Sequence, residues 1–532
     1  MSWNLAAPVL AQRHRTPDHL ALYADGVNLT YAELVQRAQR FAGALHAHGI
    51  GPKRRVAILG SRSLAAVEAV LGVAWAGAAY VPLGLRWPEV RLQSAIALAR
   101  PDAIIADERG AQLLTPQLLA SVSLVVVPRR ESIDAAIPAS GTRVLALDAL
   151  SDATVLDEPA LLSGDELAYI IFTSGTTGVP KGVMATMRSV SAYLNALGSL
   201  KALTSADRAS QFTELTFDPS VGEIFLPWAV GASLHVVPPV SNVSPARFIR
   251  ERELTIWGSA PAAIAWMRDT RSLQAGSLPG LRYTSFGGEP LSLAAVRAWQ
   301  AAAPNSVIDN LYGPTEATVD CVGQRITPGQ TPVVTPGRDI LAIGTPHPGT
   351  ALAVFDANHR LLPAGERGEL AIAGDQLTLG YLDAPKVTAE RFPVIGGKRW
   401  YLTGDIAMRD ACGMYHHFGR MDNQIKLHGH RVELEEIEAH TREVTSSDQV
   451  AAIAWPMREG VAQGIVCFVV QSAVAVSRVR ELLRLRLPAY MVPNAIREVH
   501  ALPLNANGKL DRHALIALLV SETPDTHAKP NP

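Results

Sequence analysis

A run of glycine, serine and threonine between two apolar segments carries the clearest chemistry in this sequence. Tyr169 to Phe172 are bulky and uncharged, as in a buried strand of an α/β core. The residues that follow can offer backbone amides and hydroxyls to phosphate oxygens, with Lys181 as a cation: Thr173, Ser174, Gly175, Thr176, Thr177, Gly178. Pro180 before Lys181 and Gly182 after it differ from the ordinary nucleoside-triphosphatase loop. The pattern predicts phosphate binding, although such a run by itself is as often a flexible connection.

Three more segments combine residue types that suit a nucleotide or a metal. Residues 310–316 place an aromatic ring, a Gly-Pro turn and a carboxylate, Glu316, in one loop. Residues 401–405 end in Asp405 after Thr-Gly, and Asn507-Gly508 favours a tight turn that would present Lys509. Each alone reads as a surface turn, so their significance depends on their occurring together.

Composition limits the classes of protein. The chain has 532 residues, of which 48% are hydrophobic and 18% charged, so it should divide into two or more domains with ample core. Its 48 basic and 49 acidic side chains give a formal charge of -1, which suggests neither nucleic acid nor a membrane surface as a partner. Three separated cysteines and an N-terminus with Arg13 and Arg15 favour a reduced, cytoplasmic location without an export signal.

The order of apolar and helical segments predicts the architecture. Strand-like runs alternate with helical stretches over the first 300 or so residues, which indicates parallel sheets covered by helices on both faces. Residues 340–380 have short apolar runs broken by Gly and Pro, as in a small β-rich subdomain, and the texture changes again near Arg420. Residues 521–532 have the composition of a loose tail.

Seven segments in order resemble the adenylate-forming superfamily, most closely the amino-acid adenylation domains of nonribosomal peptide synthetases. They are the phosphate loop and residues 217–225, 310–318, 368–392, 401–405, 419–438 and 504–512. The resemblance implies an α/β fold with a large N-terminal domain, residues 1–420, made of two doubly wound α/β subdomains and a small β-barrel subdomain. A small, mobile α+β C-terminal domain follows at residues 421–520. It also implies that the chain is an AMP-forming ligase that uses ATP and Mg²⁺.

The same resemblance assigns roles at the nucleotide. It implies that Tyr312 stacks on adenine, Asn310 bonds its edge, Glu316 holds Mg²⁺, Asp405 binds the ribose with help from Arg420, and Asp422 is the hinge between domains. Lys509 would bridge the substrate carboxylate and the α-phosphate, where a desolvated ammonium stabilises developing charge. Thr173 and Lys181 join Glu316 and Lys509 as expected catalytic residues. Further expected contacts to the nucleotide are Gly287, Gly288, Gly313, Thr315 and Lys426.

The resemblance also predicts the substrate site. Asp218 matches the position that pairs with the α-ammonium of an amino acid, which aryl-acid and fatty-acid activators lack. The expected pocket residues are Asp218, Pro219, Gly222, Gly258, Thr284, Phe286, Leu311, Val319, Asp320 and Lys509. Gly222 and Gly258 would leave room, and Asp320 would add a second acceptor near the side chain. We therefore expect a polar amino acid, either basic or small and hydroxylated.

Two questions about function stay open at this point. No phosphopantetheine attachment pattern, Gly-Gly-x-Ser, follows Lys509, so we expect a stand-alone enzyme that loads a separate carrier protein through its phosphopantetheine arm. The alternatives are a ligase of the same fold that delivers a non-amino acid to coenzyme A, and a catalytically silent module that binds amino acid and nucleotide. Nothing in the sequence places acidic or Cys ligands around the histidine pairs 46/48, 416/417 and 428/430, so they are predicted to be solvated, without a metal.

Overall fold

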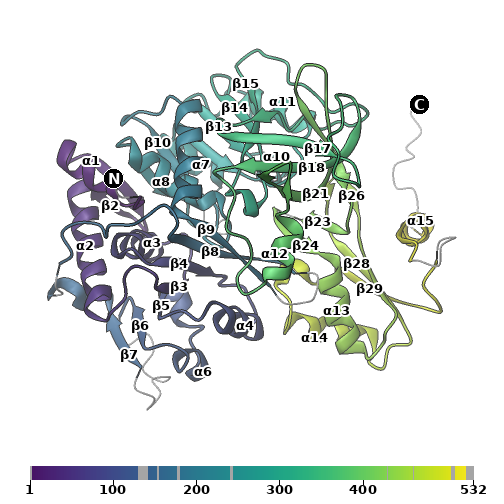
Figure 1. Cartoon of the computed structure of the whole chain (residues 1–532), viewed down its shortest axis with the longest axis horizontal. Coiled ribbons are helices and arrows are strands. Elements are labelled where there is room, and N and C mark those ends of the chain that lie inside the picture. The colour runs from purple at the N-terminus through teal and green to yellow at the C-terminus, as the bar shows by residue number, and fades with distance from the viewer. Residues whose placement is uncertain are drawn as a thin grey trace. The chain divides into compact units, whose positions relative to one another are not determined.

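The computed structural model describes residues 3–129, 142–152, 155–175, 180–239, 244–427, 429–458, 461–504 and 510–522. They form two compact units (Figure 1). The first contains residues 1–85, 92–173 and 181–422, and the second contains residues 86–91, 174–180 and 423–532. The main change of unit along the chain thus falls between Asp422 and Asn423.

The first unit has a seven-stranded sheet in which all neighbouring strands are parallel, except that the final two strands in the order below, β8 and β9, are antiparallel. Its order is β7 (Arg143–Ala146), β6 (Leu124–Val127), β5 (Ala103–Ala106), β3 (Arg55–Leu59), β4 (Ala79–Leu83), β8 (Leu167–Thr173) and β9 (Lys181–Thr186). The helices of this part of the chain are α2 (Tyr31–Ala47), α3 (Leu64–Ala76), α4 (Glu89–Ala99), α5 (Glu108–Ala111) and α6 (Pro116–Leu119).

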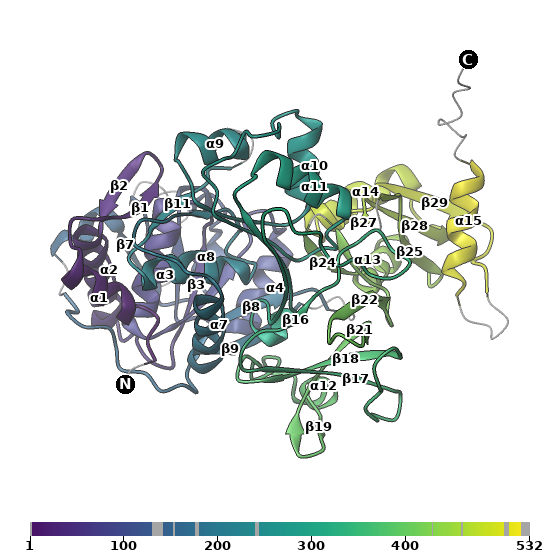
Figure 2. The same ribbon diagram turned by 90° about the horizontal axis from the view of Figure 1, so that it is seen from above.

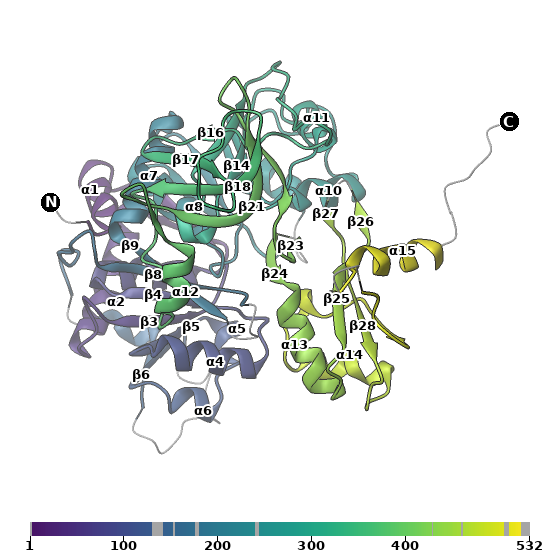
Figure 3. The ribbon, with the colours of Figure 1, turned by 45° about the vertical axis from the view of Figure 1, so that its right-hand side comes forward.

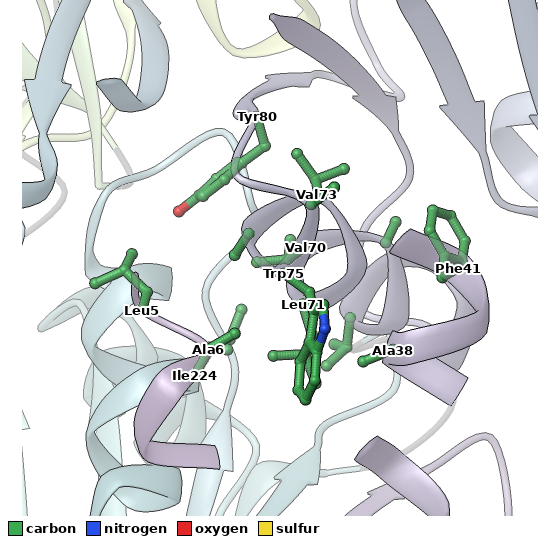
Figure 4. Close-up of a cluster of buried hydrophobic side chains, with 14 of the residues drawn as sticks. Leu5, Ala6, Ala38, Phe41, Val70, Leu71, Val73, Trp75, Tyr80 and Ile224 are labelled. Atoms are coloured by element: carbon green, nitrogen blue, oxygen red, sulfur yellow. The ribbon is translucent and has the colours of Figure 1, made fainter. Parts of the chain in front are cut away.

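Helices α2 and α3 pack closely because of their sequences. A capping box between Thr30 and Glu33 starts α2, while Ser63 caps α3 and Gly77, at φ 83°, ends it. Phe41 of α2 lies over Gly72 of α3, where an added Cβ would be 2.6 Å from the ring. Figure 4 shows Phe41 and Ala38 beside Val70, Leu71 and Trp75 in this core.

The second sheet of this unit has nine strands, with a parallel centre and antiparallel ends. Its order is β16 (Thr345–Pro346), β15 (Val322–Ile326), β14 (Val307–Tyr312), β13 (Tyr283–Phe286), β12 (Ile256–Ser259), β10 (Arg208–Gln211), β11 (Ser233–Val236), β1 (Leu20–Ala24) and β2 (Val27–Thr30). The associated helices are α1 (Ala7–Arg15), α7 (Met187–Leu200), α8 (Pro219–Ala229), α9 (Pro245–Glu251), α10 (Ala262–Asp269) and α11 (Leu293–Ala302). Two doubly wound α/β parts were predicted, and both sheets are present.

A four-stranded antiparallel sheet completes the first unit (Figure 2). It consists of β17 (Thr350–Phe355), β18 (Arg367–Gly374), β21 (Tyr401–Arg409) and β22 (Tyr415–Arg420). Helix α12 (Pro385–Arg391) and the hairpin of β19 (Val394–Ile395) and β20 (Lys398–Arg399) lie in the connection before β21. This sheet brings Asp405 and Arg420 opposite each other on adjacent strands.

The second unit is built around a three-stranded sheet of β25 (Val450–Ala454), β28 (Ile465–Val470) and β29 (Ala495–Val499). Figure 3 shows β25 and β28 of this sheet. Alternate residues of β25 and β28 face α13 (Leu434–Thr445) and α14 (Val476–Arg484), and the others face α15 (Arg512–Glu522). A second sheet contains β24 (His430–Glu433), β23 (Gln424–Leu427), β27 (Val461–Ala462) and β26 (Met457–Arg458).

Candidate active site

The phosphate loop connects two paired strands of the first unit. Thr173 ends β8 and Lys181 begins β9, and the Thr173 hydroxyl lies 3.5 Å from the carbonyl oxygen of Lys181. The ammonium of Lys181 lies 5.6 Å from the centre of the Tyr381 ring. Thr176, Thr177 and Gly178, which were predicted to bind phosphate, lie outside the described residues.

The start of the loop belongs to the second unit. There the Ser174 hydroxyl donates to the carbonyl oxygen of Arg431 at 3.0 Å, and the Gly175 amide donates to the Glu436 carboxylate at 3.2 Å. The same carboxylate accepts a hydrogen bond from Arg91 at 2.5 Å. Two of the predicted phosphate donors therefore bond protein groups in this structure.

Glu316 lies in the short 3₁₀ helix η3 (Thr315–Ala317) and is fully buried. The Tyr381 hydroxyl donates to its Oε1 at 2.7 Å. Gly313 is required just before this turn, since an added Cβ would lie 2.3 Å from the carbonyl oxygen of Val319. Thr318 and Val319 follow with φ of 55° and 75°, a strained backbone that marks functional loops. The loop thus holds a buried carboxylate and leads directly to Asp320.

Asp405 is the centre of a hydrogen-bonded group at the predicted ribose site. Arg420 donates to its Oδ1 at 2.7 Å, His417 lies 3.3 Å from the same oxygen, and the Tyr312 hydroxyl bonds to its Oδ2. Burial alone would raise the pKa of Asp405, but the hydrogen bond from His417 and the charge of Arg420 hold it well below its usual range. The geometry brings Tyr312, Asp405 and Arg420 together as an anionic acceptor beside an aromatic ring.

His417 was missed as a site residue, and the prediction of solvated histidines was wrong for the 416/417 pair. His416 is buried against Asp410, and His417 contacts both Asp405 and, at 6.2 Å between ring centres, Tyr312. The register of β21 and β22, which pairs Asp405 with Arg420 and Ala407 with His417, brings this imidazole to the site. Sequence spacing alone did not reveal that pairing.

The remaining residues that were predicted to contact the nucleotide lie on several different elements. The Asn310 amide donates to the carbonyl oxygen of Ala342 at 2.9 Å, from the buried end of β14. Gly287 and Gly288 follow β13, and Gly288 has a φ of 83°.

The predicted hinge residue Asp422 accepts two hydrogen bonds from Arg420, at 2.5 and 2.7 Å. Lys426 lies in β23 of the second unit, and Lys509 is outside the described residues.

The predicted substrate residues begin at helix α8. Asp218 is 8% exposed and directly precedes the helix, and Pro219 occupies its first turn, where proline is favourable. Gly222 does not leave the room that was predicted, because a Cβ there would lie 2.2 Å from the Tyr193 hydroxyl. Tyr193, from α7, is buried against Val319 and fills this space.

Two pocket predictions on strand β13 need correction. Thr284 bonds the Ser306 hydroxyl at 2.8 Å and the Trp299 indole at 3.0 Å, and Phe286 packs edge-on against Trp299. Both side chains are buried in the core beside α11. Alternate residues of a strand face opposite sides, so Ser285 points the other way.

Ser285 shares its face of the sheet with two other predicted pocket residues, Gly258 and Leu311. It is in register with Gly258 on β12 and with Asp309 on β14, and paired residues on parallel strands face the same side. A Cβ at Gly258 would lie 3.3 Å from Glu223 of α8, which places α8 over this face. Leu311, two residues after Asp309 on β14, also lies on this face. Ser285, and neither Thr284 nor Phe286, is therefore the β13 residue between them whose side chain faces this side.

Asp320 is a buried carboxyl group with unusual surroundings. Burial raises its pKa to about 7, with the charges of Asp218 and Asp309 adding to the rise and that of Lys201 opposing it. A hydrogen bond from Tyr193 also favours its charged form. Its Oδ1 lies 3.5 Å from His347 Nδ1, and burial lowers the pKa of that histidine to about 4.

No cluster of three or more metal-ligating side chains occurs among the residues that the structure describes. Mg²⁺ usually keeps several waters and takes one or two carboxylates together with substrate phosphates. Glu316 fits such a role as a single buried carboxylate. Within the described part of the chain, no helix has the length and apolar character needed to cross a membrane.

Comparisons with known proteins agree with this class of fold and site. The model of the AMP-binding enzyme family matches residues 9–382, and that of the AMP-binding enzyme C-terminal domain matches residues 436–509. The chain belongs to this family and, within it, to the adenylation domains of nonribosomal peptide synthetases. It is an AMP-forming ligase.

Several relatives cover nearly the whole chain. Tyrocidine synthase 3 of Brevibacillus parabrevis is 34% identical over 95% of the chain, which spans only 7% of that protein. Novobiocin biosynthesis protein H of Streptomyces niveus is 34% identical over 94% of the chain and 80% of its own length. The adenylation domain AlmE of Vibrio cholerae, solved with glycyl-adenosine-5'-phosphate, has 30% identity and a TM-score of 0.85 over 98% of both chains. PA1221, a protein with adenylation and PCP domains, has 26% identity and a TM-score of 0.80 over 97% of this chain and 84% of its own.

Proposed function

We propose that this AMP-forming ligase activates an amino acid as aminoacyl-AMP and transfers the aminoacyl group to the phosphopantetheine thiol of a carrier protein. The buried position of Asp218 is the observation that supports an amino acid as the substrate. Its carboxylate is 8% exposed at the start of α8, and a buried carboxylate favours a cationic ligand such as an α-ammonium. The solved relative AlmE contains glycyl-adenosine-5'-phosphate, an aminoacyl adenylate.

The nucleotide residues supply complementary functions. Asp405 is kept charged by His417 and Arg420, so it can accept hydrogen bonds from the ribose hydroxyls, and Tyr312 offers an aromatic face to the base. Glu316 would hold Mg²⁺ at the phosphates. The substrate carboxylate then attacks the α-phosphorus of ATP, its oxygen forms the new P–O bond, and pyrophosphate leaves with the electrons of the broken bond.

Exchange of labelled pyrophosphate into ATP tests the first half-reaction. We expect exchange that depends on an added amino acid and is absent with aryl and fatty acids. Exchange with aryl or fatty acids, and none with amino acids, would favour the alternative of a ligase that delivers a non-amino acid to coenzyme A. Absence of any pyrophosphate exchange or release would favour a silent binding module.

Intact-mass analysis tests the second half-reaction. A carrier protein bearing phosphopantetheine, supplied separately, should gain the mass of the activated aminoacyl group only when ATP is present. Failure of every candidate carrier to gain that mass would contradict the transfer step while leaving adenylation intact.

Lys509 provides a test of the adenylation chemistry. Lys509→Ala should lower exchange by about 10²-fold or more, because a cation at the reacting phosphate is lost. The unfolding temperature should change little, since the sequence predicts that Lys509 follows a turn and such a lysine would support little core. Lys386→Ala, at an exposed position of α12, is the matched control and should retain wild-type exchange.

A further inference from the structure

A buried lysine lies among the acidic residues of the predicted side-chain pocket. Lys201 follows the last residue of α7 and is only 6% exposed. Its ammonium donates to the Ser285 hydroxyl at 2.7 Å and lies 3.9 Å from Asp309 Oδ2. Its charge also reaches Asp320 and favours the ionised form of that carboxyl group. The pocket face therefore has a cation of its own.

Two neighbouring carboxylates already have protein donors. Asp309 accepts hydrogen bonds from Arg325 at 2.8 and 3.0 Å. Glu223 accepts from the amides of Phe212 and Thr213, both at 3.0 Å, and from the Thr213 hydroxyl at 2.9 Å. Neither group therefore needs a cationic side chain from a substrate.

Asp320 differs because one of its oxygens lacks a hydrogen-bond donor, although His347 Nδ1 lies 3.5 Å from it. Its Oδ1 is buried and accepts no hydrogen bond from the residues that the structure describes. A neutral donor such as a hydroxyl would satisfy this oxygen. A second ammonium would instead come close to that of Lys201, and like charges repel strongly where water is excluded.

The space on this face is also limited. Tyr193 fills the volume that Gly222 would otherwise leave open, and it packs against Val319, the residue before Asp320. Its hydroxyl bonds to the Asp320 carboxyl group. A long side chain would have to displace this buried ring.

We infer that the enzyme selects an amino acid whose side chain is small, uncharged and able to donate a hydrogen bond to Asp320, and that Lys201 is the residue that excludes basic side chains. This inference rests on the proposed amino-acid activation and narrows its substrate class. Specificity then comes in part from a repulsive element in the pocket.

Pyrophosphate exchange with three amino acids tests the inference in the wild-type enzyme. Serine, 2,3-diaminopropionate and ornithine share an α-amino acid core and differ in the terminal group. We expect kcat/KM for serine to exceed that for ornithine by about 100-fold or more, and that for 2,3-diaminopropionate by about tenfold or more. Preference for ornithine would overturn the inference without affecting the proposed function, whereas absence of exchange with every amino acid would contradict both.

Substitution of the lysine tests its role. In Lys201→Met the serine-to-ornithine ratio of kcat/KM should fall by about tenfold or more, since Asp320 would then lack an internal cation. Lys386→Met, an exposed substitution of the same type, should leave the ratio unchanged. Lys201→Gln keeps a donor for Ser285 and should shift the ratio in the same direction. If either Lys201 variant has the wild-type unfolding temperature and an unchanged serine-to-ornithine ratio of kcat/KM, the role of Lys201 is overturned. If both variants are unfolded, the serine-to-ornithine ratio of the wild-type enzyme decides whether the inference holds.

Discussion

Asp320 shows how burial alters a single side chain in this enzyme. Its pKa is raised to about 7 mainly by burial, against an ordinary value near 3.9. The folded protein therefore binds this proton more tightly than the unfolded chain does. The stability that Asp320 contributes is fully present below about pH 4 and is lost as the pH rises to about 7.

Asp320→Asn should change stability in a pH-dependent way. The amide cannot ionise, so the stability of the variant relative to the wild type should rise between pH 4 and pH 8, by on the order of a few kcal/mol. Urea unfolding at several pH values measures this difference. Asp165→Asn, at a side chain 82% exposed, is the surface control, and a flat difference for Asp320→Asn would contradict the raised pKa.

Several residues of the candidate site were named from the sequence because short motifs contain them. Tyr312, Glu316, Asp405 and Arg420 lie in such motifs, and the structure brings Tyr312, Asp405 and Arg420 into direct contact. Tyr193, Lys201 and His417 could not be predicted, since tertiary packing or strand register brings them to the site.

At the level of elements, the register of β13 determines which of its side chains face the predicted pocket. A shift of one residue reverses every side chain of a strand, and the predicted pocket residues Thr284 and Phe286 lie on the side of β13 opposite to Ser285. The order of strands and helices was easier to predict, because apolar periodicity is local. Which side of β13 faces α8 depends on its neighbours in the sheet.

Helix packing gives a prediction of its own at Gly72. Gly72→Ala should destabilise the protein by about 1–3 kcal/mol despite the better helix propensity of Ala, because the new methyl would meet the Phe41 ring. Denaturant unfolding measures the change. Gly198→Ala in α7, where the nearest atom is 3.8 Å from the added Cβ, should instead stabilise the protein by about 0.5–1 kcal/mol. Equal effects at the two positions would contradict the packing of α2 against α3.

For the whole molecule, the main boundary between the two units along the chain follows Asp422. The predicted boundary after Arg420 rested on a change in composition, and the first unit ends at Asp422. Sequence texture identifies such a boundary because each unit has its own core, but it contains no information on motion. The role of Asp422 as a hinge therefore stays a proposal.

Proline at position 422 tests the hinge. Asp422→Pro should keep pyrophosphate exchange within about threefold of the wild type and lower carrier loading by about tenfold or more, because proline fixes φ near -65° and restricts rotation. Exchange and intact-mass assays measure the two half-reactions separately. Asp422→Asn removes the charge that pairs with Arg420 but keeps backbone freedom, so it should load the carrier more readily than the proline variant. Equal loss of both half-reactions in Asp422→Pro would contradict a hinge.

The proposed function depends above all on recognition of the α-ammonium by Asp218, and a comparison of matched acids tests that recognition. Pyrophosphate exchange would be measured with the best amino acid and with the carboxylic acid that has the same side chain but no α-amino group. We expect the second acid to support exchange at least about 100-fold less well, and Asp218→Ala to cause a similar loss with the amino acid. Equal exchange with both acids, or an unaffected Asp218→Ala enzyme, would contradict that recognition.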